Sequence, residues 1–169
     1  MQYKQRALRL LALPLAAGAL LAAQAGGSAP SGTLTISGDV TSVTLTAADL
    51  ATMPRQTLAI QEPEGETSYE GVALQEVLKK AGVAFGRELR GKALAGYVLA
   101  EARDGYQVVF SLGELDADLG GARIIVADKR AGKPLFAYQG PLRLVVATDK
   151  RPARSVRMLE RLQVVRLRK

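Results

Sequence analysis

Short runs of alternating or continuous apolar residues, broken by turn residues, recur along most of the chain. Such runs are typical of β-strands rather than of long helices. Asp104-Gly105, between two of the runs, is a strong hairpin turn signal. The pattern predicts strands over residues 33–37, 43–46, 57–61, 97–102, 107–110, 124–127, 142–146 and part of 154–165. Many short strands and few helices predict an α+β domain.

Three short helices are predicted between these strands. Thr46–Asp49 and Ser111–Glu114 each have the sequence of a capping box, and the second is expected to open a helix that runs through Leu119. Apolar residues recur at helical spacing over residues 74–81. The polar segment 62–70, EPEGETSYE, is predicted to be a solvated acidic loop rather than a calcium site, because it lacks EF-hand spacing.

The first 25 residues have the organisation of a secretory signal peptide. Residues 1–9 carry three bases and no acid, residues 10–23 are uncharged, and Ala23-Gln24-Ala25 is a small-x-small cleavage pattern. The alternative is a retained membrane anchor, for which the apolar run is shorter than the ~20 residues that span a bilayer. We therefore predict a signal peptide over residues 1–25, a flexible leader over 26–32 and a single domain over 33–169.

The signal peptide predicts export to the periplasm or secretion, with no stable membrane anchor. Its basic segment, KQRALR, has no adjacent arginines, so a Sec-type route that exports unfolded chains is expected. The formal charge of +7 is concentrated at the C-terminal end, where residues 150–169 hold eight bases and one acid. Residues 26–149 hold twelve bases and fifteen acids. Nucleic acid is therefore not an expected partner, whereas an anionic ligand suits the basic end.

The composition excludes several kinds of chemistry. The sequence has no histidine and no cysteine, so disulfides, the usual structural zinc sites and Ser-His-Asp or Cys-His nucleophile systems are absent. It also has no phosphate-binding loop or dinucleotide-binding glycine pattern. General acid–base catalysis would depend on Asp, Glu, Lys or Tyr.

Five sequence segments, in this order, resemble the molybdopterin-binding domain of the sulfite oxidase family. The resemblance covers roughly residues 33–165 and implies a mixed, β-rich fold with a few short helices and a cleft of pterin size. The segments are YEGVALQEVL at 69–78, RDGY at 103–106 with SLGEL at 111–115, ADKRAGKPL at 127–135, GPLRLVV at 140–146 and RSVR at 154–157.

The chain also departs from this family. The resemblance implies a cysteine thiolate that binds molybdenum, upstream of the aromatic-x-Gly segment, but residues 60–69 contain no cysteine. Glu62 in that region would be a hard oxygen ligand and a poor substitute for a thiolate. The proline expected after Val146 is Ala147. The resemblance therefore implies the scaffold and its cleft rather than the redox reaction, and no metal site is predicted.

The candidate ligand-binding residues combine the resemblance with side-chain chemistry. Guanidinium groups suit a pterin edge or an anionic tail, a carboxylate can accept from an amino-pyrimidine edge, and tyrosine rings can stack on a flat heterocycle. Each also has an ordinary structural alternative: ion pairing or solvation for the charged residues, a turn for Asp104, and packing for the tyrosines. The candidates are Arg143, Arg154, Ser155, Arg157, Asp104, Glu101, Tyr69, Tyr106, Tyr138 and Gln139.

These features lead us to expect a non-catalytic periplasmic protein that binds a free pterin or a similar flat heterocycle, with no tightly bound cofactor. Its expected partner is the periplasmic domain of a membrane signalling protein, such as a cyclic-di-GMP enzyme. Two alternatives stay open. One is a molybdopterin-dependent oxidoreductase that holds its molybdenum cofactor without the cysteine ligand. The other is an interaction module that has lost the cleft.

Overall fold

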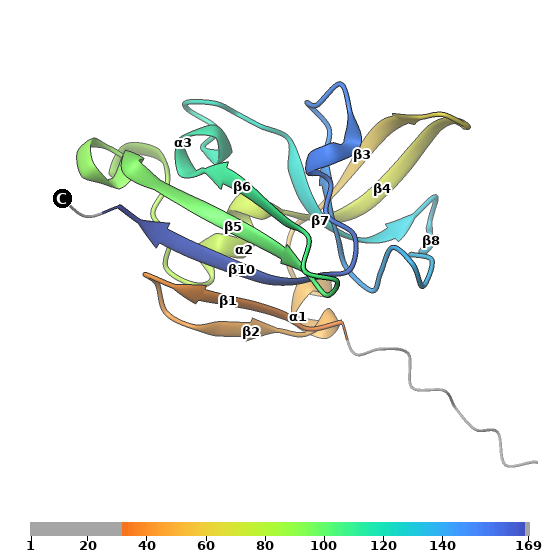
Figure 1. The fold of residues 1–169 in the computed structure, drawn as a ribbon, viewed down its shortest axis with the longest axis horizontal. Coiled ribbons are helices and arrows are strands. Elements are labelled where there is room, and N and C mark those ends of the chain that lie inside the picture. The colour runs from red at the N-terminus through yellow and green to blue at the C-terminus, as the bar shows by residue number, and fades with distance from the viewer. Residues whose placement is uncertain (1–31, 168–169) are drawn as a thin grey trace, which may run out of the picture.

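The structure, a computed structural model, describes residues 32–167 and consists of two five-stranded sheets with short helices (Figure 1). The predicted α+β, β-rich fold is confirmed. The first sheet has the order β2 (Val43–Leu45), β1 (Leu34–Gly38), β10 (Leu159–Arg166), β5 (Gly96–Ala102) and β6 (Gln107–Ser111). The second has β3 (Arg55–Glu62), β4 (Gly65–Ala73), β7 (Ile124–Arg130) and β8 (Lys133–Pro134), and β9 (Arg143–Val146) also pairs with β7.

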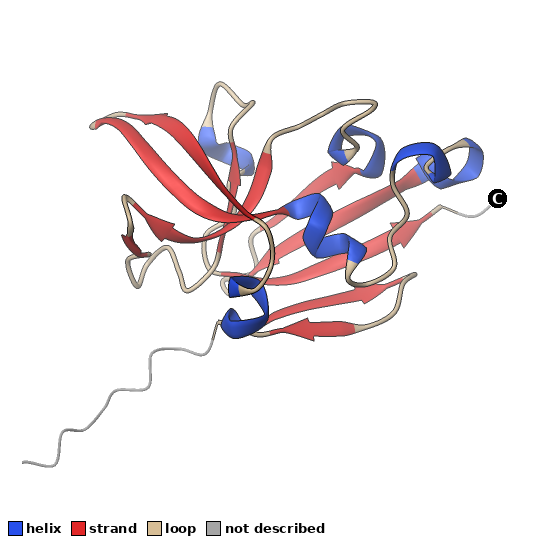
Figure 2. Cartoon of the chain, turned by 180° about the vertical axis from the view of Figure 1, so that it is seen from behind, coloured by secondary structure: helices blue, strands red, loops and turns tan. Residues whose placement is uncertain are grey.

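Nearly all neighbouring strands are antiparallel. The exception is the pair β1 and β10, which places the first and last strands of the described chain side by side. The helices are α1 (Ala47–Ala51), α2 (Leu74–Lys79) and α3 (Leu112–Leu115), with 3₁₀ turns η1 (Gly86–Glu88), η2 (Gly91–Ala95) and η3 (Pro152–Arg154). Figure 2 shows α1 and α2 on one side of the first sheet. None of the helices in residues 32–167 is long and apolar enough to cross a membrane.

The main hydrophobic core lies between the inner faces of the two sheets and extends under α2. It includes Ile36, Val72, Phe110 and Leu144, all fully buried. A second, smaller cluster of Leu58, Tyr69, Ile125, Ala127 and Val145 lies on the opposite face of the second sheet. The second sheet is therefore buried on both faces, and its outer face can form the base of a site.

Gly71 allows β4 and β7 to approach closely where their register shifts. A Cβ at this position would lie 2.1 Å from the backbone oxygen of Val126, a contact that backbone atoms cannot relieve by a rotamer change. The glycine of the aromatic-x-Gly segment is thus required by strand packing.

Most predicted elements are confirmed with small changes in their bounds. Both capping boxes form: Thr46 accepts from the backbone N–H of Asp49, and Ser111 accepts from that of Glu114. The helix predicted through Leu119 ends at Leu115, because Asp116 takes an extended backbone. The Asp116 carboxylate accepts hydrogen bonds from the backbone N–H groups of Asp118 and Gly86.

The prediction of a loop over residues 62–70 is wrong. β3 and β4 continue as a hairpin out to the pair Glu62 and Gly65, and this hairpin extends beyond the body of the domain (Figure 1). Because residues 62–70 are mostly polar or charged, they do not show the apolar–polar alternation that predicts a strand. The predicted signal peptide, residues 1–25, and nearly all of the leader, 26–32, lie outside the described residues.

Candidate ligand-binding cleft

A cleft opens on the outer face of the second sheet, between the β3–β4 hairpin and the segment that precedes β10. It has two adjoining parts. The floor compartment, about 680 Å³, includes Glu62, Arg130, Gln139 and Arg143 in its lining. The outer compartment, about 580 Å³, includes Asp104, Tyr106, Arg151 and Met158. Both are lined by Tyr138, Pro152, Ser155 and Arg157, so the two parts adjoin along a shared wall.

Strand alternation places the side chains of the floor. Residues two apart on a strand share a face, so Glu62 lies on the same face of β3 as Leu58, and Arg143 lies on the same face of β9 as Val145. Leu58 and Val145 belong to the second hydrophobic cluster. The polar residues of the floor are therefore mounted on a packed apolar layer, which fixes their backbone positions.

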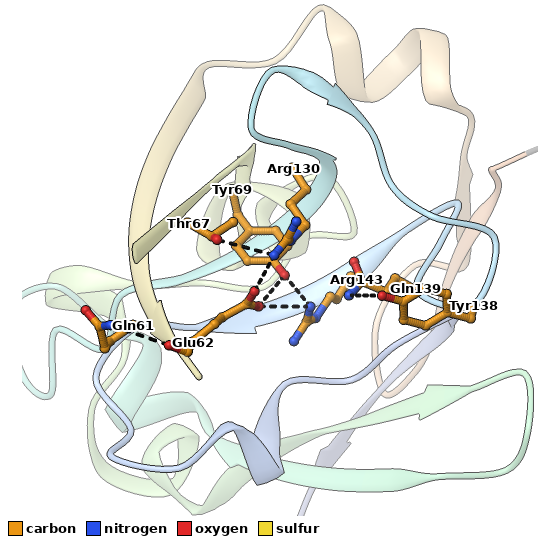
Figure 3. A network of polar contacts seen from close by, with 8 residues as sticks. All are labelled: Gln61, Glu62, Thr67, Tyr69, Arg130, Tyr138, Gln139 and Arg143. Carbon is orange, nitrogen blue, oxygen red and sulfur yellow. Dashed lines mark hydrogen bonds and ion pairs between the residues drawn. The ribbon is translucent and has the colours of Figure 1, made fainter. Parts of the chain in front are cut away.

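Glu62, Tyr69, Arg130 and Arg143 form a polar cluster that we call the floor network (Figure 3). Glu62 Oε1 accepts from the Tyr69 hydroxyl at 2.7 Å, and Glu62 Oε2 accepts from Arg130 Nη2 at 2.6 Å. Arg143 Nη1 donates to the Tyr69 hydroxyl oxygen and lies 3.8 Å from Glu62 Oε1. The Arg143 guanidinium also lies over the Tyr69 ring, 4.9 Å from its centroid. Both oxygens of Glu62 are thus engaged within the protein.

The network shifts the ionisation of its members. Burial alone would raise the pKa of Glu62, but hydrogen bonds from Arg130 and Tyr69 and the nearby guanidinium charges outweigh it, so the pKa is lowered. The pKa of Tyr69 is raised, mainly by burial and then by its hydrogen bond to the Glu62 carboxylate. Glu62 is therefore a carboxylate and Tyr69 a neutral phenol at neutral pH.

Three buried polar atoms at the floor have no hydrogen-bond partner among the described residues. They are Arg130 Nε, Arg143 Nε and Gln139 Oε1. Gln139 and Arg143 are each only 7% exposed. An unsatisfied buried group of this kind costs about 1–3 kcal/mol, so native proteins usually supply it with a partner. Arg143 Nε is thus an unsatisfied donor and Gln139 Oε1 an unsatisfied acceptor, on side chains that line the floor compartment.

Seven of the ten predicted site residues line the cleft. Arg143 and Gln139 lie in the floor compartment, Asp104 and Tyr106 in the outer one, and Tyr138, Ser155 and Arg157 in both. The Ser155 hydroxyl also accepts from the backbone N–H of Val146 at 3.1 Å, which holds the segment before β10 against β9.

The other three predicted residues line neither compartment. Glu101 pairs with Arg161 directly across the strands β5 and β10. Arg154 is held by Asp149 and Glu114, at 2.6 and 2.7 Å, and lies over the ring of Phe110. Tyr69 is fully buried beneath Arg143, so its ring is not available to stack on a ligand and its hydroxyl instead supports the floor.

Sequence reasoning missed two residues of the floor network. Arg130 lies beyond the predicted strand over residues 124–127, but β7 continues as far as Arg130. Glu62 was considered only as a replacement for the metal ligand and as part of an acidic loop. The alternation of β3, extended by a few residues, puts Glu62 on the face of Leu58 and Tyr69. Arg130 reaches this face because the register of β4 and β7 shifts next to Gly71, which places Arg130 opposite Tyr69.

Comparison with known families identifies the domain. The model of the family described as "Oxidoreductase molybdopterin binding domain" matches residues 60–169. The chain belongs to this family. The matched region thus begins near the end of β3 and includes all four residues of the floor network. A comparison with curated protein sequences finds no match.

Among solved structures, the crystal structure of the sulfane dehydrogenase SoxCD from Paracoccus pantotrophus is similar, with a TM-score of 0.62 and 20% sequence identity. The similarity covers 78% of this chain and 37% of that one, so this chain spans well under half the length of the SoxCD chain. At this identity the comparison supports the fold: the mixed, β-rich domain is that of the molybdopterin-binding family.

The cleft of this family member suits the two parts of a molybdenum cofactor unequally. The unsatisfied donor and acceptor atoms of Arg143 and Gln139 match the polar edge of a pterin. The molybdenum part does not fit. The sequence has no thiol to offer, and both carboxylate oxygens of Glu62 already accept strong hydrogen bonds. Among residues 32–167 no group of three or more His, Cys, Asp or Glu side chains converges on a point.

Proposed function

We propose that this molybdopterin-binding-family domain is a non-catalytic binding protein for a free pterin or a similarly flat heterocycle, and that it works in the periplasm. The observation that carries the proposal is that some polar groups of the floor are satisfied within the protein and others are not. Glu62, a carboxylate in the segment where the resemblance implies the metal ligand, is satisfied within the protein, whereas Gln139 Oε1 and Arg143 Nε are buried and unsatisfied.

The chemistry of these atoms favours a pterin over a purely apolar ring. The edge of an amino-oxo-pyrimidine carries N–H donors and a carbonyl acceptor side by side. Once the Gln139 side chain turns toward the cleft, an N–H of the ligand can donate to its Oε1, and the carbonyl of the ligand can accept from the Arg143 guanidinium. Tyr138, which is 58% exposed, offers a ring at the mouth of the same compartment.

A periplasmic binding protein needs a means of reporting its ligand. We propose that the liganded domain docks on the periplasmic part of a membrane signalling protein, such as a cyclic-di-GMP enzyme. The predicted signal peptide supports this role. Co-purification of the partner from solubilised membranes, dependent on added pterin, is the expected result. Identical co-purification with and without pterin would contradict a reporting role.

The binding proposal is tested by titrating the purified protein with 6-hydroxymethylpterin and following the intrinsic fluorescence of the pterin. Gln139→Leu is expected to weaken binding by about tenfold or more, the equivalent of one lost hydrogen bond in a buried site. Gln163→Leu, at an exposed position on β10, is the matched control and should leave the affinity unchanged. No saturable binding to the wild-type protein would refute the proposal, and equal affinity of the Gln139→Leu variant would place the ligand elsewhere.

A further inference from the structure

The cleft is larger than a bicyclic pterin requires. Cavities of roughly 300–1,000 Å³ hold drug-sized ligands, and each of the two compartments falls within that range on its own. The floor compartment has the buried polar atoms that suit the heterocycle. The outer compartment has a different lining, which indicates what a second part of the ligand would look like.

Two tyrosine rings line the outer compartment, and each is held in place. Tyr106 is 48% exposed, and its hydroxyl donates to the backbone oxygen of Ala153 at 2.6 Å. Tyr138 stacks on Phe136 with parallel rings, 5.6 Å between centroids. Phe136 covers part of Tyr138 while more than half of the Tyr138 side chain stays exposed. Held aromatic surfaces with exposed rings suit a planar, partly apolar group.

The charge of this compartment is positive. Neither Arg151 nor Arg157 has an ion pair or side-chain hydrogen bond among the described residues. The neighbouring Arg154 differs, because it is neutralised by Asp149 and Glu114. The one acid in the lining, Asp104, accepts the backbone N–H of Tyr106. Two unpaired guanidinium groups beside aromatic rings favour a ligand group that is both flat and anionic.

We infer that the ligand has two parts: a pterin in the floor compartment and, linked to it, an aromatic ring with a carboxylate in the outer compartment. This is the chemistry of a pteroate. The inference rests on the proposed function and adds the class of ligand. The shared wall formed by Tyr138, Ser155 and Arg157 is where the link between the two parts would pass.

The experiment compares pteroic acid with 6-hydroxymethylpterin on the same protein. The wild-type protein is expected to bind pteroic acid at least about tenfold more tightly. Tyr106→Ala and Arg151→Gln alter residues that line only the outer compartment. Each should remove most of the advantage of pteroic acid while changing the affinity for 6-hydroxymethylpterin by no more than about twofold. Retained binding of the smaller pterin also shows that each variant is folded.

Two controls sharpen the result. Tyr106→Phe keeps the ring and should keep most of the advantage of pteroic acid. Arg87→Gln removes a charge from η1, outside both compartments, and should have no effect. Equal affinities of the wild-type protein for the two probes would overturn the inference and leave the proposed function standing. Equal weakening of both probes by Tyr106→Ala would also overturn it. Failure of both probes to bind would overturn the proposed function itself.

Discussion

Replacing Glu62 by glutamine is expected to destabilise the domain through the floor network. The substitution keeps the shape of the side chain but removes its charge. Glu62 lies between Arg130 and Arg143, and its side chain is 16% exposed, compared with 23% and 9% for the two arginines. Glu62→Gln therefore leaves two guanidinium groups in a largely buried place without their counter-charge.

The expected loss lies between two limits. Removing one partner of a fully buried ion pair costs about 3–5 kcal/mol, whereas an exposed pair contributes about 0–1 kcal/mol. The intermediate exposure of Glu62 and Arg130 places the loss at about 2 kcal/mol. Tyr69→Phe removes only the hydroxyl that links Glu62 and Arg143, so it should cost about 1 kcal/mol. Because the two residues are in contact, the double variant should lose less than the sum.

Urea unfolding followed by far-ultraviolet circular dichroism measures these losses. The midpoint should fall in Glu62→Gln with the slope unchanged, since the surface exposed on unfolding is the same. Glu64→Gln, on the exposed turn of the same hairpin, is the matched control and should stay within about 0.5 kcal/mol of the wild type. An unchanged or higher midpoint for Glu62→Gln would show that the floor network does not hold the cleft together.

Three further predictions follow from other contacts. Arginine partners lower the pKa of Glu62 and of Asp149 below their ordinary values of 4.5 and 3.8. The two carboxylates therefore contribute fully to the stability of the fold above those values, and this contribution is lost as the pH falls through the lower, folded-state pKa. Unfolding midpoints should drop in acid, and should drop less in Glu62→Gln. Gly71→Ala should cost about 3 kcal/mol or more, seen as loss of soluble, folded protein, because the added Cβ meets the backbone of β7; a soluble variant of wild-type stability would contradict this. Arg154→Ala should lower stability by about 1 kcal/mol in thermal unfolding, because its ion pairs with Glu114 and Asp149 are lost. It should leave pterin affinity within about twofold, because Arg154 lines neither compartment; a large loss of affinity would restore it to the binding site.

The fold could be predicted because most strands show their alternation in the sequence. The hairpin of β3 and β4 is the instructive failure, since EPEGETSYE has the composition of a loop. Its strands are set by pairing with each other and by the close packing of β4 on β7, neither of which local composition reports.

The candidate site could be predicted only in part, for a related reason. Residues near the turns and in the segment before β10, such as Tyr106 and Arg157, line the cleft. Glu101 and Arg154 do not, because each finds its partner through the tertiary structure: Arg161 across the sheet in one case, and Glu114 on α3 in the other. An ion pair between residues 40 or more positions apart leaves no mark in a single sequence.

The most direct test of the account is an analysis of what the full-length protein carries after purification from a host that makes both free pterins and the molybdenum cofactor. The unfolded extract is assayed for fluorescent pterin and for molybdenum. The account predicts bound pterin with molybdenum far below one atom per chain. Molybdenum at near one atom per chain would contradict it and would show that the family's redox cofactor binds here without a thiolate ligand.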